Sequence, residues 1–483
     1  MPCPGRWNGH QPPDPSTMGT SSPQRQQAAL VTACASNSFR LAADCVIGFS
    51  RRASRGLRCV ACNVPRRRLM PDRREGVPIF VAKDPKLHPR MLLPRRTAGP
   101  ARFPFTDPTI QYWYLGRNAS YALIKLLGLA GHEVLFPAYF GGPVLEAPLA
   151  AGARIRFYPV RAGMHVDPED IRARITPETR AIYLIHFAGF PGPVEDVHHI
   201  YREHGLVLIE DCAHALLSSL GDRPLGTFGD GAIFSFYKWV PVPNGAALTL
   251  RHPHGALAQP EQRQSRTSGL ALSAFSLLDH LALRWNAPGR ALRGIVRTAG
   301  RSASHATGLA YVLPGGITFE HDHLDLGMSG IARHILANQD FARIIARRRR
   351  NYEHLADLLA GVAPPIQGPL PPGVTPLFYA TRVLYKRAVV ERLRTKGVEA
   401  RSFWEFHHPL LPPGIMPETD DLRQTVLELP IHPDLTPAAI ERMAQAVRET
   451  IGSKAIVGRG IAWQPVCACT EPEAAGITPA HLA

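Results

Sequence analysis

The chain has 483 residues, of which 45% are apolar and 19% charged, and it carries a formal net charge of +16. This is the composition of an ordinary soluble protein with two to four domains, and no stretch reaches the roughly 18 uninterrupted apolar residues that a membrane helix needs. Residues 1–100 hold 17 Lys and Arg against 5 Asp and Glu, which is +12 of the total. Because few aromatic residues are interleaved with these charges, they are weak support for nucleic-acid binding, and we expect neither a nucleic-acid partner nor a membrane.

The N-terminal segment 1–75 is rich in Pro, Ser, Arg and Gln and shows no sustained periodicity. We expect it to be disordered, or to be translated sequence upstream of the true start, with Met70 and Met91 as alternative starts. Its Arg and Ser content also suits a transit peptide, whereas a secretory signal is not indicated. The predicted domains are this segment, a large domain over 76–325, a small C-terminal domain over 326–455 and a tail over 456–483.

Eight cysteines are spread along the chain. The pairs Cys59 with Cys62 and Cys467 with Cys469 could in principle bind zinc, but they lie in the two terminal segments without a Cys or His partner at the usual spacing. We therefore predict free thiols and no metal. The absence of a disulfide framework favours a reducing compartment, and the predicted location is cytoplasmic.

The organised part of the chain begins near residue 107. Apolar residues at helical spacing predict a helix over 118–129, with Asn118 as its N-cap and Gly128 near its end. Strands and helices then alternate, which predicts a mainly parallel, doubly wound sheet with helices on both faces. The expected strands are 133–139, 154–160, 181–187, 206–211 and 232–237, and the expected helices are 143–151, 167–175 and 194–204.

Residues 251–325 are hard to interpret, although 270–283 and 291–296 have helical character. A long helical pattern follows over 328–359 and includes Arg347 to Arg350, which we interpret as a solvated face. Short strands mixed with helices over 386–396 and 437–451 predict a small α+β domain.

Two of the expected strands end close to an acid and an amine, two groups of complementary chemistry. The apolar strand from Leu206 ends at Asp211, and the strand from Ala232 is followed by Lys238. Ligands bind at the carboxyl ends of strands in such sheets. A lysine amine can form a Schiff base with the aldehyde of pyridoxal phosphate (PLP), and a carboxylate can keep the pyridine nitrogen protonated. Taken alone, Asp211 could equally cap a helix starting at Ala213, and Lys238 could be an ordinary lysine at a strand end.

The order of the motifs resembles the PLP-dependent sugar aminotransferases of the DegT/StrS type over roughly residues 80–452. The matching blocks are, in chain order, GRNASYALIKLLGLAGHEVLFPAYF, AAGARIRFYPV, IHFAGFPGPVEDV, IEDCAHA, GDRPLGTFGD, FSFYK, LGMSGIARHIL, KGVEARSFWEFHHPL and LELPIHPDLTPAAIERM. The resemblance implies the α/β fold of PLP-transferase type I with a small α+β C-terminal domain. It also implies a homodimer with its site at the interface.

The resemblance assigns a role to each matching position. Lys238 matches the Schiff-base lysine and Asp211 the acid facing the pyridine nitrogen. The other implied cofactor contacts are His214 near the phenolic oxygen, Ala213 against one ring face, Tyr139 as a candidate for the other face, and Gly116, Arg117, Asn118 and Ser235 around the phosphate. Each also has a structural alternative: His214 could be a core histidine, and Gly116 to Asn118 a simple turn and cap.

The chain also departs from the family pattern. The link between Ser235 and Lys238 is shorter by two residues, and Trp239 to Pro243 form an apolar, Pro-containing replacement for a Thr/Gly-rich loop. The second glycine of the family is Ala246 here. These changes put sugar-nucleotide specificity in doubt more than cofactor binding.

The function predicted from these residues is transamination, with an amino group passing from a small-molecule donor, glutamate by the resemblance, to a keto sugar or a related keto compound. Two alternatives remain within the fold: a non-catalytic PLP-binding regulatory homologue, and a PLP-dependent sugar dehydratase. In the dehydratases the lysine is typically histidine, so Lys238 favours transamination.

Overall fold

The computed structural model describes residues 80–93, 102–251 and 324–452, together with 263–264, 270, 273–274, 276–281 and 295. All of them belong to one compact unit, Arg74–Ala483. The predictions for residues 1–75, for the tail 456–483, for the paired cysteines and for most of 251–325 lie outside the described residues.

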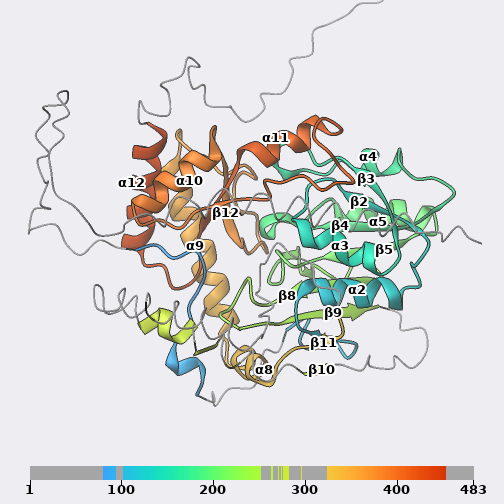
Figure 1. The fold of residues 1–483 in the computed structure, drawn as a ribbon, viewed down its shortest axis with the longest axis horizontal. Helices are drawn as coiled ribbons and strands as arrows, with labels where there is room; N and C mark the ends of the chain where they lie inside the picture. The colour runs from blue at the N-terminus through green and yellow to red at the C-terminus, as the bar shows by residue number, and fades with distance from the viewer. Residues whose placement is uncertain are drawn as a thin grey trace, which may run out of the picture. The chain divides into compact units, whose positions relative to one another are not determined.

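A mixed sheet forms the centre of the large domain (Figure 1). Its strands are β1 (Gln111–Trp113), β2 (Glu133–Pro137), β3 (Arg154–Tyr158), β4 (Thr179–Ile185), β5 (Val207–Asp211), β8 (Gly231–Ser235), β9 (Ala246–Leu250), β10 (Arg263–Gln264) and β11 (Leu326–Gly327). They lie in the order β10-β11-β1-β9-β8-β5-β4-β2-β3. The five predicted strands are confirmed as β2, β3, β4, β5 and β8, and they pair in parallel.

Short antiparallel strands that were not predicted extend the sheet beyond β8. β9 pairs antiparallel with β8, and β1 pairs antiparallel with β9. The strands β1, β10 and β11 are two or three residues long, too short for an alternation that sequence could reveal. A two-stranded ribbon, β6 (Ser219–Leu220) and β7 (Arg223–Pro224), lies between β5 and β8 in the chain.

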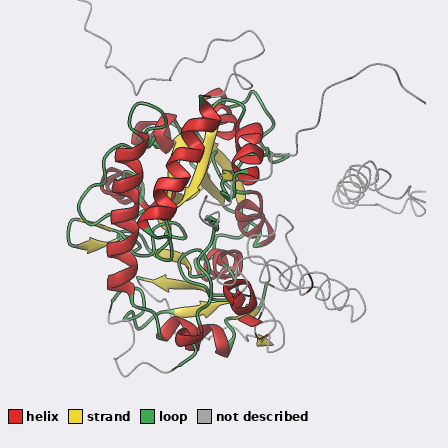
Figure 2. Cartoon of the chain, turned by 90° about the vertical axis from the view of Figure 1, so that its left-hand side faces the viewer, coloured by secondary structure: helices red, strands yellow, loops and turns green. Residues whose placement is uncertain are grey.

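Helices follow the strands as predicted and lie on both sides of them (Figure 2). The helices of the large domain are α2 (Gly116–Leu126), α3 (Gly142–Ala150), α4 (Pro168–Arg172) and α5 (Val194–Glu203), with 3-10 turns η2 (Pro89–Met91), η3 (Ala162–Met164) and η4 (Phe187–Gly189). α2 packs on β8 and β9, and α5 packs on β4 and β5. Every residue of β2 and β8 is buried, as expected of strands covered on both faces.

The predicted start of the first helix was wrong by two residues. α2 begins at Gly116, and Leu115 occupies the N-cap position. Asn118 lies in the first turn instead, where its Oδ1 accepts a hydrogen bond from the Leu115 N–H at 3.2 Å. The side chain thus satisfies one free donor of the helix N-terminus from inside the helix. Gly128 adopts φ 66° just after the helix, as its predicted place at the end requires.

The C-terminal part contains a small antiparallel sheet with the order β12-β14-β13. Its strands are β12 (Phe378–Arg382), β13 (Arg401–Ser402) and β14 (Val426–Pro430), and its helices are α8 (Gly330–Ala337), α9 (Phe341–Leu359), α10 (Lys386–Thr395), α11 (Pro417–Thr425) and α12 (Pro437–Ile451). α12 packs on both α9 and α10 (Figure 1). The predicted pattern over 328–359 is two helices rather than one, because Asp340 caps α9 through the Arg343 N–H.

The arginine run in α9 is not the solvated face that we expected. Arg347 donates to the Leu435 carbonyl, Arg348 to that of Leu377, and Arg349 to that of Pro371. Arg350 is exposed. The run therefore joins α9 to the rest of the small domain, a role that an arginine fork serves well. No helix among the described residues is long and apolar enough to cross a membrane.

Candidate active site

The ends of β5 and β8 bring the predicted acid and amine to one edge of the large sheet. The two strands are parallel neighbours, with Asp211 in register with Ile233. Asp211 is the last residue of β5, and Lys238 comes three residues after the end of β8 at Ser235. Because the carboxyl ends of parallel strands share an edge, the two side chains belong to one site.

Asp211 is buried and firmly held. Its Oδ2 accepts a hydrogen bond from the Tyr183 hydroxyl at 2.9 Å, and its Oδ1 accepts one from the Ala213 N–H at 2.9 Å. Residues 213–217 form turns rather than a helix, so Asp211 does not cap a helix there. These two donors fix the position of the carboxylate. The sequence did not identify Tyr183, because a tyrosine in the middle of a buried strand carries no distinguishing pattern.

Lys238 lies between two fully buried side chains, Phe236 and Trp239, and is itself only partly exposed. Burial lowers the pKa of its amine to about 8, while the negative charges of Asp211 and Glu428 act in the opposite direction. A lysine with this pKa is mostly charged at neutral pH with a minor neutral fraction, and it becomes mostly neutral above about pH 8. It can therefore act as a nucleophile or a base.

The N-terminus of α2 and the end of β8 meet beside this pair. A Cβ added at Gly116 would lie 3.8 Å from the Cβ of Ser235, so the two residues are in contact distance. Ser235 is buried, and its Oγ lacks a hydrogen-bond partner of normal geometry, although the Tyr237 hydroxyl lies near enough to interact. A helix N-terminus with a buried hydroxyl beside it suits an anion such as a phosphate.

His214 lies in the same site in its neutral form. Burial, followed by the positive charges of Lys238 and Arg401, holds the pKa of its imidazole well below the ordinary value. Its Nδ1 is buried, and within the described part of the chain it has no hydrogen-bond partner. Its ring lies 5.2 Å from that of Trp404 and 5.8 Å from that of Phe378, between centroids. The neighbouring Ala213 is also buried.

Tyr139 follows β2 and is directed toward the small domain. Its hydroxyl donates to the Phe403 carbonyl at 3.4 Å, and its ring packs edge-on against Phe403 and Trp404. Arg423 also lies over the Tyr139 ring and donates to the Ala138 carbonyl. Tyr139 is thus close to residues that surround His214, and its contact with a cofactor ring stays a prediction.

A charged cluster in the small domain, Asp84, Arg401 and Glu428, was not predicted. Arg401 pairs with both carboxylate oxygens of Asp84 at 2.7 and 2.8 Å, and its Nη1 lies 3.5 Å from Glu428 Oε1. Arg401 and Glu428 are directly opposite on β13 and β14, and Glu428 is opposite Ala380 on β12. Phe378 lies on the same sheet face as Ala380 and contacts His214, so this face is directed toward the site.

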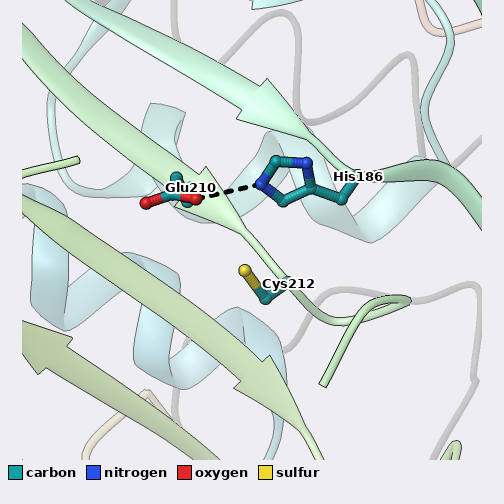
Figure 3. Close-up of side chains that lie close together, drawn as sticks. All are labelled: His186, Glu210 and Cys212. Atoms are coloured by element: carbon teal, nitrogen blue, oxygen red, sulfur yellow. Dashed lines mark hydrogen bonds and ion pairs between the residues drawn. The ribbon is translucent and has the colours of Figure 1, made fainter. Parts of the chain in front are cut away.

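His186, Glu210 and Cys212 lie behind the site at the ends of β4 and β5 (Figure 3), with potential ligand atoms within 4.8 Å of one another. His186 Nδ1 accepts from the Gly192 N–H, so Nε2 carries the proton and donates to Glu210 at 3.1 Å. Such an imidazole has no free lone pair for a metal. Burial raises the pKa of the Cys212 thiol well above its usual value.

Glu210 organises the loop that precedes β8. Its carboxylate accepts hydrogen bonds from the backbone N–H groups of Gly226, Phe228 and Gly229 at 2.7–2.8 Å, in addition to the one from His186. All of these atoms are buried. The group is therefore a satisfied hydrogen-bond network that connects β4, β5 and the start of β8.

The fold and the site define an α/β enzyme with an acid and a lysine at the carboxyl edge of its sheet. The model of the DegT/DnrJ/EryC1/StrS aminotransferase family matches residues 116–253 and 329–448, which is more than half of the chain. The chain belongs to this family, and the resemblance inferred from the motifs is confirmed. The two matched segments contain all nine predicted site residues.

Solved structures share the fold. The putative sugar aminotransferase Spr1654 from Streptococcus pneumoniae, in its PMP-form, is 15% identical with a TM-score of 0.53 over 72% of this chain and 88% of its own. The aminotransferase TlmJ from Streptoalloteichus hindustanus is 22% identical, with a TM-score of 0.50 over 71% and 85%. DesI, crystallised in the presence of its TDP-sugar product, is 22% identical, with a TM-score of 0.50 over 72% and 82%.

Proposed function

We propose that this protein is a PLP-dependent aminotransferase that transfers an amino group to a keto sugar, with Lys238 as the residue that binds the cofactor covalently. The observation that carries the proposal is the pair of Lys238 and Asp211. The amine has its pKa lowered to about 8 and is electrostatically coupled to a buried carboxylate at the same sheet edge. Membership of the aminotransferase family and the pneumococcal relative in its PMP-form support the choice of cofactor.

The residues around this pair fit PLP. The phosphate would lie at the N-terminus of α2, where Gly116, Arg117 and Asn118 begin the helix and the buried hydroxyl of Ser235 lies beside it. The Nδ1 of His214, which has no hydrogen-bond partner among the described residues, belongs to a neutral imidazole beside the lysine. Such a group would suit a hydrogen bond with the phenolic oxygen of PLP. A buried polar atom without a partner is costly, so this Nδ1 favours a bound polar ligand.

When bound, PLP supplies an aldehyde and an electron-accepting ring. Asp211 would accept a hydrogen bond from the pyridine nitrogen and hold its proton, while Tyr183 and the Ala213 N–H keep the carboxylate in place. Ala213 would lie against one ring face. Lys238, once released from the cofactor, would take a proton from the α-carbon of the amino donor as a neutral amine. The lowered pKa makes that form available.

The proposed amino acceptor is a keto sugar attached to a nucleotide, and the proposed donor is glutamate. DesI, a fold relative, was crystallised with a TDP-sugar product, and Spr1654 is described as a sugar aminotransferase. We also propose a homodimer, which light scattering on the purified protein would test. A dehydratase is disfavoured by Lys238, since the resemblance places histidine there in dehydratases.

The visible absorption spectrum tests the proposal directly. The purified protein is reconstituted with PLP and measured before and after adding glutamate, with Lys238→Ala alongside. We expect a cofactor band in the wild type that is lost when the donor is added, and no such band in the variant. Borohydride reduction followed by peptide mass spectrometry should place the cofactor on Lys238.

Lys386 is a matched internal control for that trapping experiment. Burial also lowers its pKa to about 8, but its amine donates to the carbonyls of Phe403 and Arg423 and lies away from Asp211. Labelling of Lys386 instead of Lys238 would contradict the assignment. If the wild type binds PLP but no amino donor removes the cofactor band, the result would support the non-catalytic alternative.

A further inference from the structure

The lysine turn, residues Phe236 to Val240, is held from both ends by buried groups. The Trp239 and Val240 N–H groups donate to the Phe236 carbonyl at 2.9 and 3.0 Å, and the Phe236 N–H donates to Gly245. Phe236 and Trp239 are fully buried. The backbone on either side of Lys238 is therefore anchored by two buried rings.

Trp239 connects the lysine turn to the residues that hold Asp211. Its indole Nε1–H donates to the Ala213 carbonyl at 3.2 Å, and the Ala213 N–H donates to Asp211 at 2.9 Å. One peptide segment thus bonds the acid on one side and the lysine turn on the other. The position of Lys238 relative to Asp211 depends on this link.

Arg348 reaches the same turn from α9, more than a hundred residues further along the chain. Its Nη2 donates to the Trp239 carbonyl at 3.4 Å, its guanidinium lies 5.0 Å from the indole centroid, and its Nη1 donates to the Leu377 carbonyl. Leu377 precedes Phe378, which contacts His214. Arg348 thus joins the lysine turn to the strand that packs on the site.

Burying the charged side chain of Arg348 is energetically unfavourable. It is 1% exposed, and among the described residues its Nε has no hydrogen-bond partner. The negative charges of Asp434, Asp84 and Glu428 act on it, but its hydrogen bonds go to backbone carbonyls. Burial lowers the pKa of its guanidinium to about 9. A buried cation costs stability in the interior, where an apolar side chain would not. Its hydrogen bonds to the carbonyls of Trp239 and Leu377 indicate that it positions these two segments.

We propose that Trp239 and Arg348 are positioning residues that set the location of Lys238 relative to Asp211. The Trp239 indole bonds the lysine turn to the Ala213 carbonyl. Arg348, in α9, contacts the indole and donates to the carbonyls of Trp239 and of Leu377, the residue before β12. This inference rests on the proposed function, because it concerns the amine that would bind PLP. It adds two residues outside the predicted site and joins the small domain to the lysine.

The test uses the whole protein and two readouts. The pKa of Lys238 is measured without cofactor, from the pH dependence of its acetylation by acetic anhydride followed by peptide mass spectrometry. The affinity for PLP is measured by absorption titration. The main variant is Trp239→Phe, which keeps a ring but removes the N–H and changes no charge. Arg348→Lys keeps the charge and removes the fork, and Arg350→Lys on the exposed face of the same helix is the control.

With Trp239→Phe we expect the pKa of Lys238 to rise from about 8 toward its ordinary 10.5, since the amine becomes better hydrated. PLP should bind about tenfold more weakly. Arg348→Lys should shift both quantities in the same direction, and Arg350→Lys should change neither. Should the smaller ring at position 239 not be tolerated, Arg348→Lys carries the same test.

The proposal is overturned if folded variants at positions 239 and 348 retain the wild-type Lys238 pKa and PLP affinity. A purely structural role would lower the unfolding temperature and leave both readouts unchanged. The proposed function fails separately, when the wild type itself binds no PLP. The two failures are therefore distinguishable in the same set of measurements.

Discussion

The two ends of the candidate site are held in different ways. At the end of β5, Asp211 receives its hydrogen bonds from Tyr183 on the adjacent strand β4 and from Ala213 two residues away. After β8, the lysine turn is bonded by Arg348 in α9, and Asn244, shortly after the turn, is bonded to Ser329 at the start of α8. The acid is built into the large sheet, whereas the amine is held in part by the small domain. The small domain can therefore influence the lysine without disturbing the acid.

The largest effect is expected from Asp211→Asn, which tests the acid end alone. The amide can still accept from Ala213, but it cannot hold a proton on the pyridine nitrogen. We expect amino transfer to be slower by about 10²–10³-fold, with PLP still bound. Single-turnover absorption measurements with glutamate check this. Asp222→Asn, at an exposed position, is the control, and equal rates in the two variants would remove Asp211 from the mechanism.

Glu210→Gln tests whether the end of β5 is held by its own network. The Gln side chain would place an NH₂ group among donors that now face a carboxylate, the N–H groups of Gly226, Phe228 and Gly229. We expect the free energy of unfolding to fall by about 2–4 kcal/mol. Urea denaturation measures it, with the exposed Glu195→Gln as control. A loss no larger than that of the control would show that the network is dispensable.

The burial of Lys238 predicts a pH-dependent cost in the cofactor-free protein. Folding lowers its pKa from 10.5 to about 8, so below about pH 8 the amine is charged in both states and folding bears the full cost of burying the charge. The cost falls as the pH rises through the interval between the two pKa values and is absent above it. Lys238→Met should therefore be more stable than the wild type by about 1–2 kcal/mol at about pH 7.

That difference should shrink toward zero as the pH approaches about 10.5. Urea denaturation of the two cofactor-free proteins across this range measures it. A gain of the variant that is constant with pH would come from packing and would contradict a buried amine.

The smallest change in stability is expected for the second link to the small domain, which joins Asn244, shortly after the lysine turn, to Ser329. Asn244 Nδ2 donates to Ser329 Oγ at 3.1 Å, and the Ser329 N–H donates to Asn244 Oδ1 at 3.0 Å. A double-mutant cycle with Asn244→Ala and Ser329→Ala should give a coupling of about 1 kcal/mol in unfolding. Additive effects would mean that this link does not hold the turn.

The local pattern of the chain was enough to predict several elements and to place Asp211 and Lys238 at the ends of two strands, which the structure shows to be neighbours. The apolar run before Asp211 and the one before Lys238 each predicted a strand, and α12 has the predicted bounds, Pro437–Ile451. These predictions succeeded because strand and helix periods are set by which face of each element is buried, and neighbouring residues record that choice. The motif order likewise predicted the family that the comparison confirmed.

Contacts between distant segments were decided only by the tertiary structure. Nothing near Arg348 in the sequence distinguishes it from Arg350, yet one is buried on Trp239 and the other is exposed. The same holds for Arg401, which meets Asp84 across more than three hundred residues, and for Tyr183 beneath Asp211. The sequence by itself determined which chemistry the strand ends deliver, because that information is local. The structure decided what surrounds and positions them, because burial and pairing depend on how elements far apart in the chain pack together.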